Sequence, residues 1–320
     1  MTVTHDSPFA LRYLAWMRER FPLTPTLLFV VLYGTVLLYG RWLTHDGPLA
    51  IGWRELLGFS ACYGFFLMLR VFDEHKDFAK DLHNFPERVL QRGLITLGHL
   101  KVAGALCLAA QIGVSLWFDG GAFGHVWWHW VAVLVWSLLM LREFFISEWL
   151  SKRLVLYALS HMLIMPLAEL WMAQMGALGR ELPWTVLWIS ALSFSSGMSF
   201  EIARKLKAPE DERETVDSYT KSLGLRGAPL AVFVCLGTSL ALQLVLVAHI
   251  NSDALPLWAP LVLGPYLLAT AWALWRFAAA PSAKRSKLCE GLTSIAMLVG
   301  YTVVLIALVS DRGVAWSGSQ

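Results

Sequence analysis

The sequence predicts an all-α, polytopic membrane protein with nine transmembrane helices. Of its 320 residues, 57% are hydrophobic and only 15% are charged, whereas a soluble domain is ordinarily about 45–50% apolar and about 25% charged. The mean hydropathy is +0.56. Apolar stretches of roughly 20 residues, long enough to cross a bilayer as a helix, recur along the whole chain.

These stretches place the nine predicted helices in order along the chain. Their approximate ranges are 25–43, 51–71, 94–117, 126–142, 154–175, 184–201, 228–250, 256–276 and 290–310. Most of the 26 Lys and Arg residues lie before the first helix or in the loops after the even-numbered ones, and such residues favour the cytoplasmic side. We therefore expect an integral protein of a bacterial inner membrane, with a cytoplasmic N-terminus and the C-terminus on the opposite side.

The N-terminal segment, residues 1–24, sets several arginines among Leu, Trp and Phe. This pattern is typical of an amphipathic helix on the surface of the lipid bilayer. The net charge of +3 is small and scattered, so it does not indicate nucleic acid as a partner. The four cysteines stand singly, which favours small core residues over disulfides or metal ligands.

Few polar residues fall inside the predicted helices, and the fifth holds the most notable ones. Glu169 lies towards the outer end of that helix, and Pro166 precedes it. We expect the proline to kink the helix. An ionisable group at membrane depth is a functional candidate, but near the outer end a structural hydrogen bond is the favoured role for Glu169.

The first long inner loop, residues 72–93, carries an unusual acidic pattern. Asp73, Asp77 and Asp81 recur at every fourth position, which places their carboxylates along one face of a helix, with Glu74 one residue off that line. Carboxylates gathered at a helix end suit Mg²⁺, which takes one or two of them together with phosphate oxygens. The alternative is a solvated, salt-bridged helix face, because lysines interleave with the acids at positions 76 and 80.

The second long inner loop, residues 202–227, follows the sixth predicted helix. Glu201, Arg204 and Lys205 lie where that helix ends, and further acids follow Pro209. A carboxylate beside clustered cations suits a metal–phosphate group. The positive-inside rule with local ion pairs would explain this loop alone; two such loops on one side of the membrane favour a binding site.

The residues of these loops resemble the two Asp-rich motifs of the UbiA superfamily of intramembrane prenyltransferases. The first family motif, N-D-x-x-D-x-x-x-D followed by N-K-P-D-R-P, is similar to the run from Asp73 to Arg88 without a gap. The second, D-x-x-x-D, is similar to the segment from Glu201 to Lys205, with the later Leu-Gly of the family at 223–224. The resemblance implies a UbiA-like bundle in a single domain over residues 1–320, with loops 72–93 and 202–227 at the active site.

The resemblance also implies an activity and a site. The activity is Mg²⁺-assisted transfer of a prenyl group from a polyprenyl diphosphate to a small aromatic or polar-headgroup acceptor whose identity the sequence does not reveal. The implied catalytic residues are Asp73, Asp77, Asp81 and Glu201. The implied metal ligands are Asp73, Glu74, Asp77, Asp81, Glu201 and Asp211. The implied diphosphate-binding residues are Arg88, Arg204, Lys205 and Lys207.

One departure from the second motif leaves alternatives open. Lys205 stands where the family has a carboxylate. It would either bind phosphate directly with fewer Mg²⁺ ions, leave the metal to Asp211, or mark a chain that has lost catalysis. Two other functions therefore stand beside the transferase: a non-catalytic membrane protein that binds lipid phosphates, and a transporter gated by the acidic loops.

Overall fold

The computed structural model describes residues 3–22, 26–213 and 217–317. Its helices are α1 (Phe9–Arg20), α2 (Thr26–Thr44), α3 (Trp53–Lys76), α4 (Phe78–Asn84), α5 (Leu97–Phe118), α6 (His125–Leu141), α7 (Ser147–Ser151), α8 (Leu154–Met162), α9 (Ile164–Gly176), α10 (Leu187–Arg204), α11 (Tyr219–Ile250), α12 (Trp258–Ala279) and α13 (Ala283–Arg312). Three short 3₁₀ turns, η1 (Glu143–Phe145), η2 (Trp184–Val186) and η3 (Pro209–Asp211), lie between them. The predicted all-α class is confirmed.

The membrane-spanning segments match the predicted ones closely but not in number. Within the described residues, eight helical segments are long and apolar enough to cross a membrane. The remaining predicted span, 126–142, is helix α6, which has 17 residues. At 1.5 Å per residue it rises about 26 Å, which is less than the ~30 Å of a hydrocarbon core. By length alone, α6 is therefore too short to count as a membrane-spanning helix.

Two predicted spans are interrupted. The fifth consists of α8 and α9, which meet at Leu163. Pro166 follows three residues later and has no N–H to donate to the preceding turn, so the interruption lies where the proline was expected to act. Helix α11 begins nine residues before the predicted 228, and within it Gly224 has φ 76° and ψ 169°, a backbone conformation that glycine adopts readily.

The end of the second span differs from the prediction in a way that matters for the site. Helix α3 continues to Lys76, past the predicted boundary at 71. The short helix α4 then starts at Phe78, and Asp77 lies between the two helices. Asp73 and Asp81 therefore belong to two helices joined at Asp77, and the three carboxylates do not lie along one continuous helix.

Helices α2 and α9 cross in backbone contact. At Gly40 of α2 an added Cβ would overlap the backbone of Ala173, and at Gly176 of α9 it would overlap the carbonyl of Leu37. Any larger residue at either position would force the two helices apart. These helices belong to the largest buried hydrophobic cluster, which gives the bundle a rigid centre.

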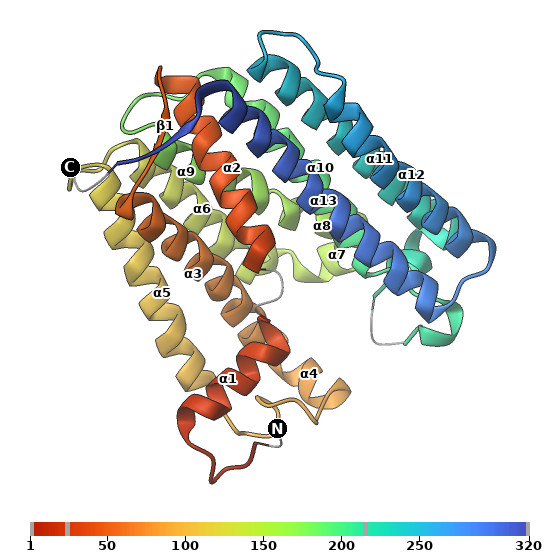
Figure 1. Cartoon of the computed structure of the whole chain (residues 1–320). Coiled ribbons are helices and arrows are strands. Elements are labelled where there is room, and N and C mark those ends of the chain that lie inside the picture. Colours follow the sequence, from red (N-terminus) through yellow and green to blue (C-terminus); the bar gives the residue numbers. More distant parts are fainter. Residues whose placement is uncertain (1–2, 23–25, 214–216, 318–320) are drawn as a thin grey trace.

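The two ends of the bundle are formed by different segments of the chain (Figure 1). Figure 1 shows α1, α4 and the N-terminus at one end and the C-terminus at the opposite end. At the C-terminal end, β1 (Leu49–Ile51) pairs in parallel with β2 (Val314–Trp316). The acidic and basic residues singled out in the sequence lie at the other end, where α3 and α10 finish.

Candidate active site

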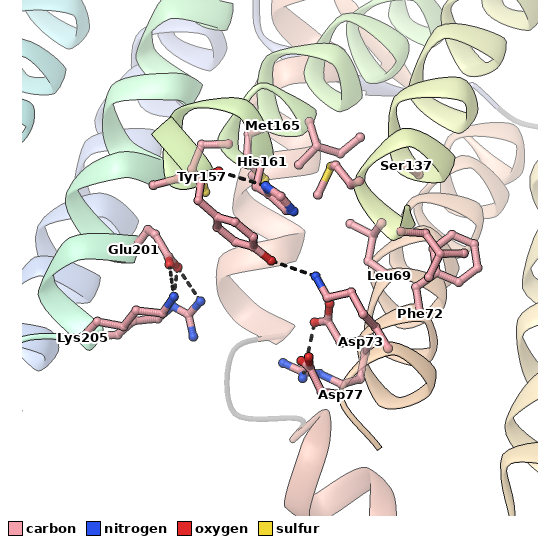
Figure 2. A pocket seen from close by; sticks show the side chains of 18 residues that line it. Leu69, Phe72, Asp73, Asp77, Ser137, Tyr157, His161, Met165, Glu201 and Lys205 are labelled. Carbon is pink, nitrogen blue, oxygen red and sulfur yellow. Dashed lines mark hydrogen bonds and ion pairs between the residues drawn. The ribbon is translucent and has the colours of Figure 1, made fainter. Parts of the chain in front are cut away.

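Two cavities of about 430 Å³ each lie among the helix ends that carry these residues. The first, which we call the apolar-walled cavity, lies between the ends of α3, α6, α8 and α10 (Figure 2). The second, which we call the polar cavity, lies beside α4 and is reached by Arg20 of α1. The two adjoin, because both are lined by Arg70, Asp77, Tyr157, Arg204 and Lys205.

The two cavities differ in the rest of their lining. The apolar-walled cavity has a hydrophobic wall made by Leu69, Phe72, Met140, Leu141, Met162, Ile164 and Met165. Figure 2 shows Leu69 and Phe72 across the cavity from Glu201 and Lys205. The polar cavity is lined instead by Arg20, Lys80, Asp81, Asn84, Phe85, Arg88, Glu143, Ser151, Leu154 and Asp217. A cavity that is charged at one end and hydrophobic at the other suits an amphiphilic ligand.

Asp77 is the carboxylate that lines both cavities. Among the described residues its carboxylate has no hydrogen-bond or ion-pair partner, and it lies at the joint between α3 and α4. Burial raises the pKa of Asp77, and the nearby carboxylates of Asp73 and Asp81 raise it further, against the opposing effect of Lys76 and Lys80. The structure thus holds a partly buried, unpaired negative charge next to two others, an arrangement that a bound cation would stabilise.

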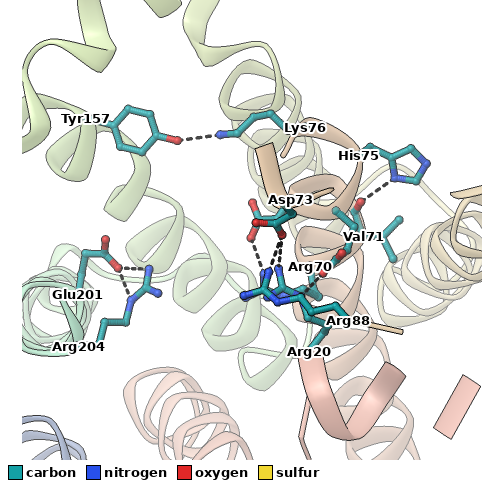
Figure 3. A network of polar contacts seen from close by, with 12 residues as sticks. Arg20, Arg70, Val71, Asp73, His75, Lys76, Arg88, Tyr157, Glu201 and Arg204 are labelled. Carbon is teal, nitrogen blue, oxygen red and sulfur yellow. Dashed lines mark hydrogen bonds and ion pairs between the residues drawn. The ribbon is translucent and has the colours of Figure 1, made fainter. Parts of the chain in front are cut away.

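The other predicted metal ligands of the first loop are paired with arginines (Figure 3). Glu74, whose side chain is 1% exposed, forms an ion pair with Arg20. Oδ2 of Asp81 accepts hydrogen bonds from Arg88 at 2.7 Å and from Arg20 at 3.4 Å. Asp73 has a looser ion pair, at 3.5 Å, with Arg70 one turn earlier. Asp73 and Asp77 are therefore the carboxylates of this loop that are freest to bind a metal.

Arg20 reaches the site because α1 is docked against the first loop. Trp16 is fully buried in a cluster with Leu90 and other residues of α3 and the loop. Glu19 accepts a hydrogen bond from the backbone N–H of Val89 at 3.2 Å. The predicted amphipathic segment is therefore helical from Phe9. One face of this helix packs against the first loop, and exposed Leu14 lies on another face.

At the second loop, Glu201 lies between two cations. Lys205 Nζ is 2.8 Å from one carboxylate oxygen, and Arg204 Nε donates to the other at 2.6 Å. All three side chains line the apolar-walled cavity. The lysine that departs from the family motif thus pairs with the acid of the same motif, and it presents positive charge to both cavities.

Two predicted residues lie elsewhere. Lys207 and Asp211 line a third hollow, together with Arg213 and residues of the α13 start such as Lys287. Neither lines the cavity that holds Asp73 and Glu201. Their predicted roles in diphosphate and metal binding have no support from this placement.

The fit to Mg²⁺ rests on few ligands. No three His, Cys, Asp or Glu residues of the described part of the chain converge to hold a metal ion. Mg²⁺ needs only one or two carboxylates when phosphate oxygens and water complete its octahedron. Asp73 and Asp77, which line one cavity beside cations suited to phosphate, fit such a site; the remaining ligand assignments stay predictions.

Several residues of the site were not singled out by spacing alone. These are Arg20, Arg70 and Tyr157, all of which line one or both cavities. Arg70 had a local signal, because it precedes Asp73 by three residues on one helix. Arg20 and Tyr157 come from segments about 140 residues apart, and no periodicity connects them.

Comparison with known proteins identifies the fold. No protein-family model and no curated protein matches the chain. Among solved structures, it is similar to a digeranylgeranylglyceryl phosphate synthase, with TM-score 0.61 and 16% identity over 95% of this chain and 99% of that one. It is also similar to a UbiA homolog from Aeropyrum pernix K1, with TM-score 0.56 and 16% identity over 87% of this chain and 97% of that one. This chain therefore shares the fold of these two solved structures, one of which is a UbiA homolog.

Proposed function

We propose that this protein is an intramembrane prenyltransferase that moves a prenyl group from a polyprenyl diphosphate to a small acceptor. The observation that carries the proposal is the apolar-walled cavity itself. Its charged end holds Asp73, Asp77, Arg204 and Lys205, and its opposite wall is hydrophobic. A diphosphate head and an isoprenoid tail have matching chemistry, and the surrounding fold is one in which a prenyl-lipid synthase has been solved.

In this proposal the cations of the cavity bind the diphosphate. Arg204 and Lys205 are held in place by Glu201, so they are ordered before the substrate arrives. Arg70, which belongs to α3, also lines this cavity. Fixed positive groups stabilise the negative charge that grows on the departing diphosphate. Glu201 then acts chiefly by positioning the two cations.

Asp73 and Asp77 would hold Mg²⁺. When bound there, the ion would supply Lewis-acid neutralisation of the diphosphate oxygens. The unpaired carboxylate of Asp77 supports this assignment, because it forms no ion pair or hydrogen bond among the described residues. Asp81 would contribute by holding Arg20 and Arg88 at the polar cavity.

The acceptor would enter through the polar cavity. This cavity shares Asp77 and Tyr157 with the apolar-walled one, so a molecule there would lie next to the reacting end of the donor. Its lining of charged and amide side chains suits a small aromatic or polar-headgroup acceptor. We further propose that this end of the bundle faces the cytoplasm in a bacterial inner membrane, as the distribution of Lys and Arg suggests.

One observation favours a second candidate, a non-catalytic binder of lipid phosphates. The pairing of Glu201 with Lys205 and Arg204 leaves this carboxylate less available to a metal than the family motif requires. Direct phosphate binding by the two cations would then be the whole function. The two candidates differ in whether binding needs Mg²⁺ and whether a product forms.

The test is product formation by the purified full chain. The protein is incubated with labelled geranylgeranyl diphosphate, Mg²⁺ and a panel of aromatic and polar-headgroup acceptors. Asp77→Ala should abolish any transfer seen, whereas Asp253→Ala, at an exposed position outside both cavities, should leave it intact. Full activity of the Asp77 variant would remove the metal site from the proposal, and transfer to none of the acceptors, with donor binding intact, would favour the non-catalytic binder.

A further inference from the structure

Lys76, the last residue of α3, is held at the apolar-walled cavity by two oxygens. Its Nζ donates a hydrogen bond to Tyr157 Oη at 2.7 Å (Figure 3). It also lies 3.3 Å from Glu143 Oε1. Its side chain is 19% exposed. A lysine on a solvated helix face would pair with acids one turn away on its own helix; this one is directed to other elements.

An ammonium group has three N–H donors and no acceptor. One N–H of Lys76 donates to Tyr157 Oη, Glu143 is its ion-pair partner, and the described residues offer its Nζ no other hydrogen bond. Lys76 also lines the apolar-walled cavity. An N–H of Lys76 is therefore available to a ligand bound there, from a group whose position is already fixed by Tyr157 and Glu143.

The residue that fixes Lys76 comes from a strained segment. Glu143, Phe144 and Phe145 of η1 have φ of 46°, 54° and 59°, in the left-handed region that non-glycine residues avoid. Phe144 is kept there by its ring contacts with Trp136 and His161, at centroid distances of 5.2 and 5.7 Å. Such conformations persist where the surroundings enforce them, often at functional sites.

The three residues lie across the boundary between the two cavities. Glu143 lines the polar cavity, Lys76 lines the apolar-walled one, and Tyr157 lines both. Asp77 and Arg204 also line both cavities, whereas the hydrophobic wall belongs to the apolar-walled cavity alone. In a bound prenyl diphosphate, the bond between the first prenyl carbon and the diphosphate oxygen would lie at such a junction of charged and apolar lining.

We propose, on the basis of the function proposed above, that Lys76 is a catalytic residue and that Glu143 is its positioning residue. The carbon–oxygen bond of the donor breaks, and its electron pair stays on the diphosphate oxygen. Lys76 donates a hydrogen bond from a free N–H to the departing diphosphate and stays protonated. The prenyl carbon forms its new bond to the acceptor, and the proton that the acceptor loses goes to water in the polar cavity.

The test measures binding of inorganic diphosphate to the detergent-purified full chain by calorimetry, with and without Mg²⁺. Lys76→Met should weaken binding by about tenfold or more, the worth of one hydrogen bond to a charged group. Lys76→Gln provides a second neutral variant should the first fold poorly. Lys152→Met, at an exposed lysine that lines neither cavity, is the matched control and should bind like the wild type.

A double-mutant cycle tests the role of Glu143. Glu143→Gln should weaken diphosphate binding several-fold in the wild-type background and not at all in the Lys76→Met background, because Glu143 acts through Lys76. Glu148→Gln, at an exposed acid of α7, is the control. Additive effects would show that Glu143 has a merely structural role, and wild-type affinity in both Lys76 variants would overturn the proposal.

The outcomes separate this inference from the proposed function. If the protein transfers prenyl groups but binds diphosphate equally well in the Lys76 variants, this inference is refuted and the proposed function is not. Diphosphate binding that depends on Lys76, without transfer to any acceptor, would refute the transferase and confine Lys76 to the binding of phosphate, overturning its catalytic role. A wild-type protein that binds no diphosphate would overturn both.

Discussion

Removing the guanidinium of Arg20 should destabilise the protein strongly. This side chain joins α1 to two acids of the first loop, Glu74 and Asp81. Asp81 retains Arg88 at 2.7 Å when Arg20 is lost. Glu74 retains no ion-pair partner among the described residues, its side chain is 1% exposed, and its second carboxylate oxygen has no hydrogen-bond partner.

The expected loss of stability follows from this difference between Asp81 and Glu74. Breaking a buried ion pair by removing one partner costs about 3–5 kcal/mol, because the other charge is left buried without compensation. Arg20 is itself 16% exposed, so water can partly replace it and we expect a loss near the lower end, about 3 kcal/mol. Removing both charges, as in Arg20→Met with Glu74→Gln, should restore more than half of the loss, since no uncompensated charge then remains.

Thermal unfolding in detergent measures both variants. Arg20→Met should lower the melting temperature by roughly 6 °C or more, and the double variant should recover most of that shift. Arg18→Met, at an exposed position of the same helix, controls for the loss of positive charge from α1. Equal melting temperatures for Arg20→Met and Arg18→Met, or no recovery in the double variant, would refute the reasoning.

Three further predictions concern single positions. Asp77→Asn should raise the melting temperature of metal-free protein at pH 7, because the raised pKa of Asp77 means that its ionised form costs free energy in the folded state; the gain should disappear at acidic pH, where the carboxyl is protonated in both states. Gly40→Ala should destabilise the protein by several kcal/mol through overlap with α9, while Gly34→Ala on the same helix, which has open space beside it, should not. Tyr301→Phe should cost about 1–3 kcal/mol in thermal unfolding, because it removes the 2.6 Å hydrogen bond to buried Glu169; an unchanged melting temperature would contradict that role.

The fold was predictable from the sequence because hydropathy reports directly on membrane crossing. The structure confirms the all-α class and places helices at the expected ranges, with α6 shorter than a typical span. It also confirms the structural hydrogen bond expected of Glu169 and the break near Pro166. The all-α class and the helix break depend on local composition and on the covalent geometry of proline, which a sequence displays in full.

The site was predictable only as far as its local spacing. Asp73 and Asp77 come together with Glu201 and Lys205 in one cavity, as loops on one side of a membrane allow. The helix break at Asp77 was missed because three acids at every fourth position favour a continuous helix in the pattern alone. The pairing of Asp81 with Arg20, 61 residues away in sequence, depends on how α1 docks, and no spacing rule contains that information.

Lys205 illustrates how a structure changes the meaning of a motif. In the sequence it stands where a carboxylate was expected, and it counts as a lost metal ligand. In the structure it forms an ion pair with Glu201 at 2.8 Å and lines both cavities beside Arg204. In the proposed site, the substitution would exchange a metal ligand for a phosphate-binding cation and leave the metal to Asp73 and Asp77.

The measurement that tests the central claim most directly is the thermal shift of the purified protein with geranylgeranyl diphosphate, first with Mg²⁺ and then with a chelator. At a ligand concentration of about 100 times Kd, binding to the folded state alone stabilises it by about 2.7 kcal/mol. We predict a rise in melting temperature that requires Mg²⁺ and is lost in Asp77→Ala. A rise that survives the chelator would contradict the metal site and leave Arg204 and Lys205 as a metal-free phosphate site, and no rise at all would contradict the donor site itself.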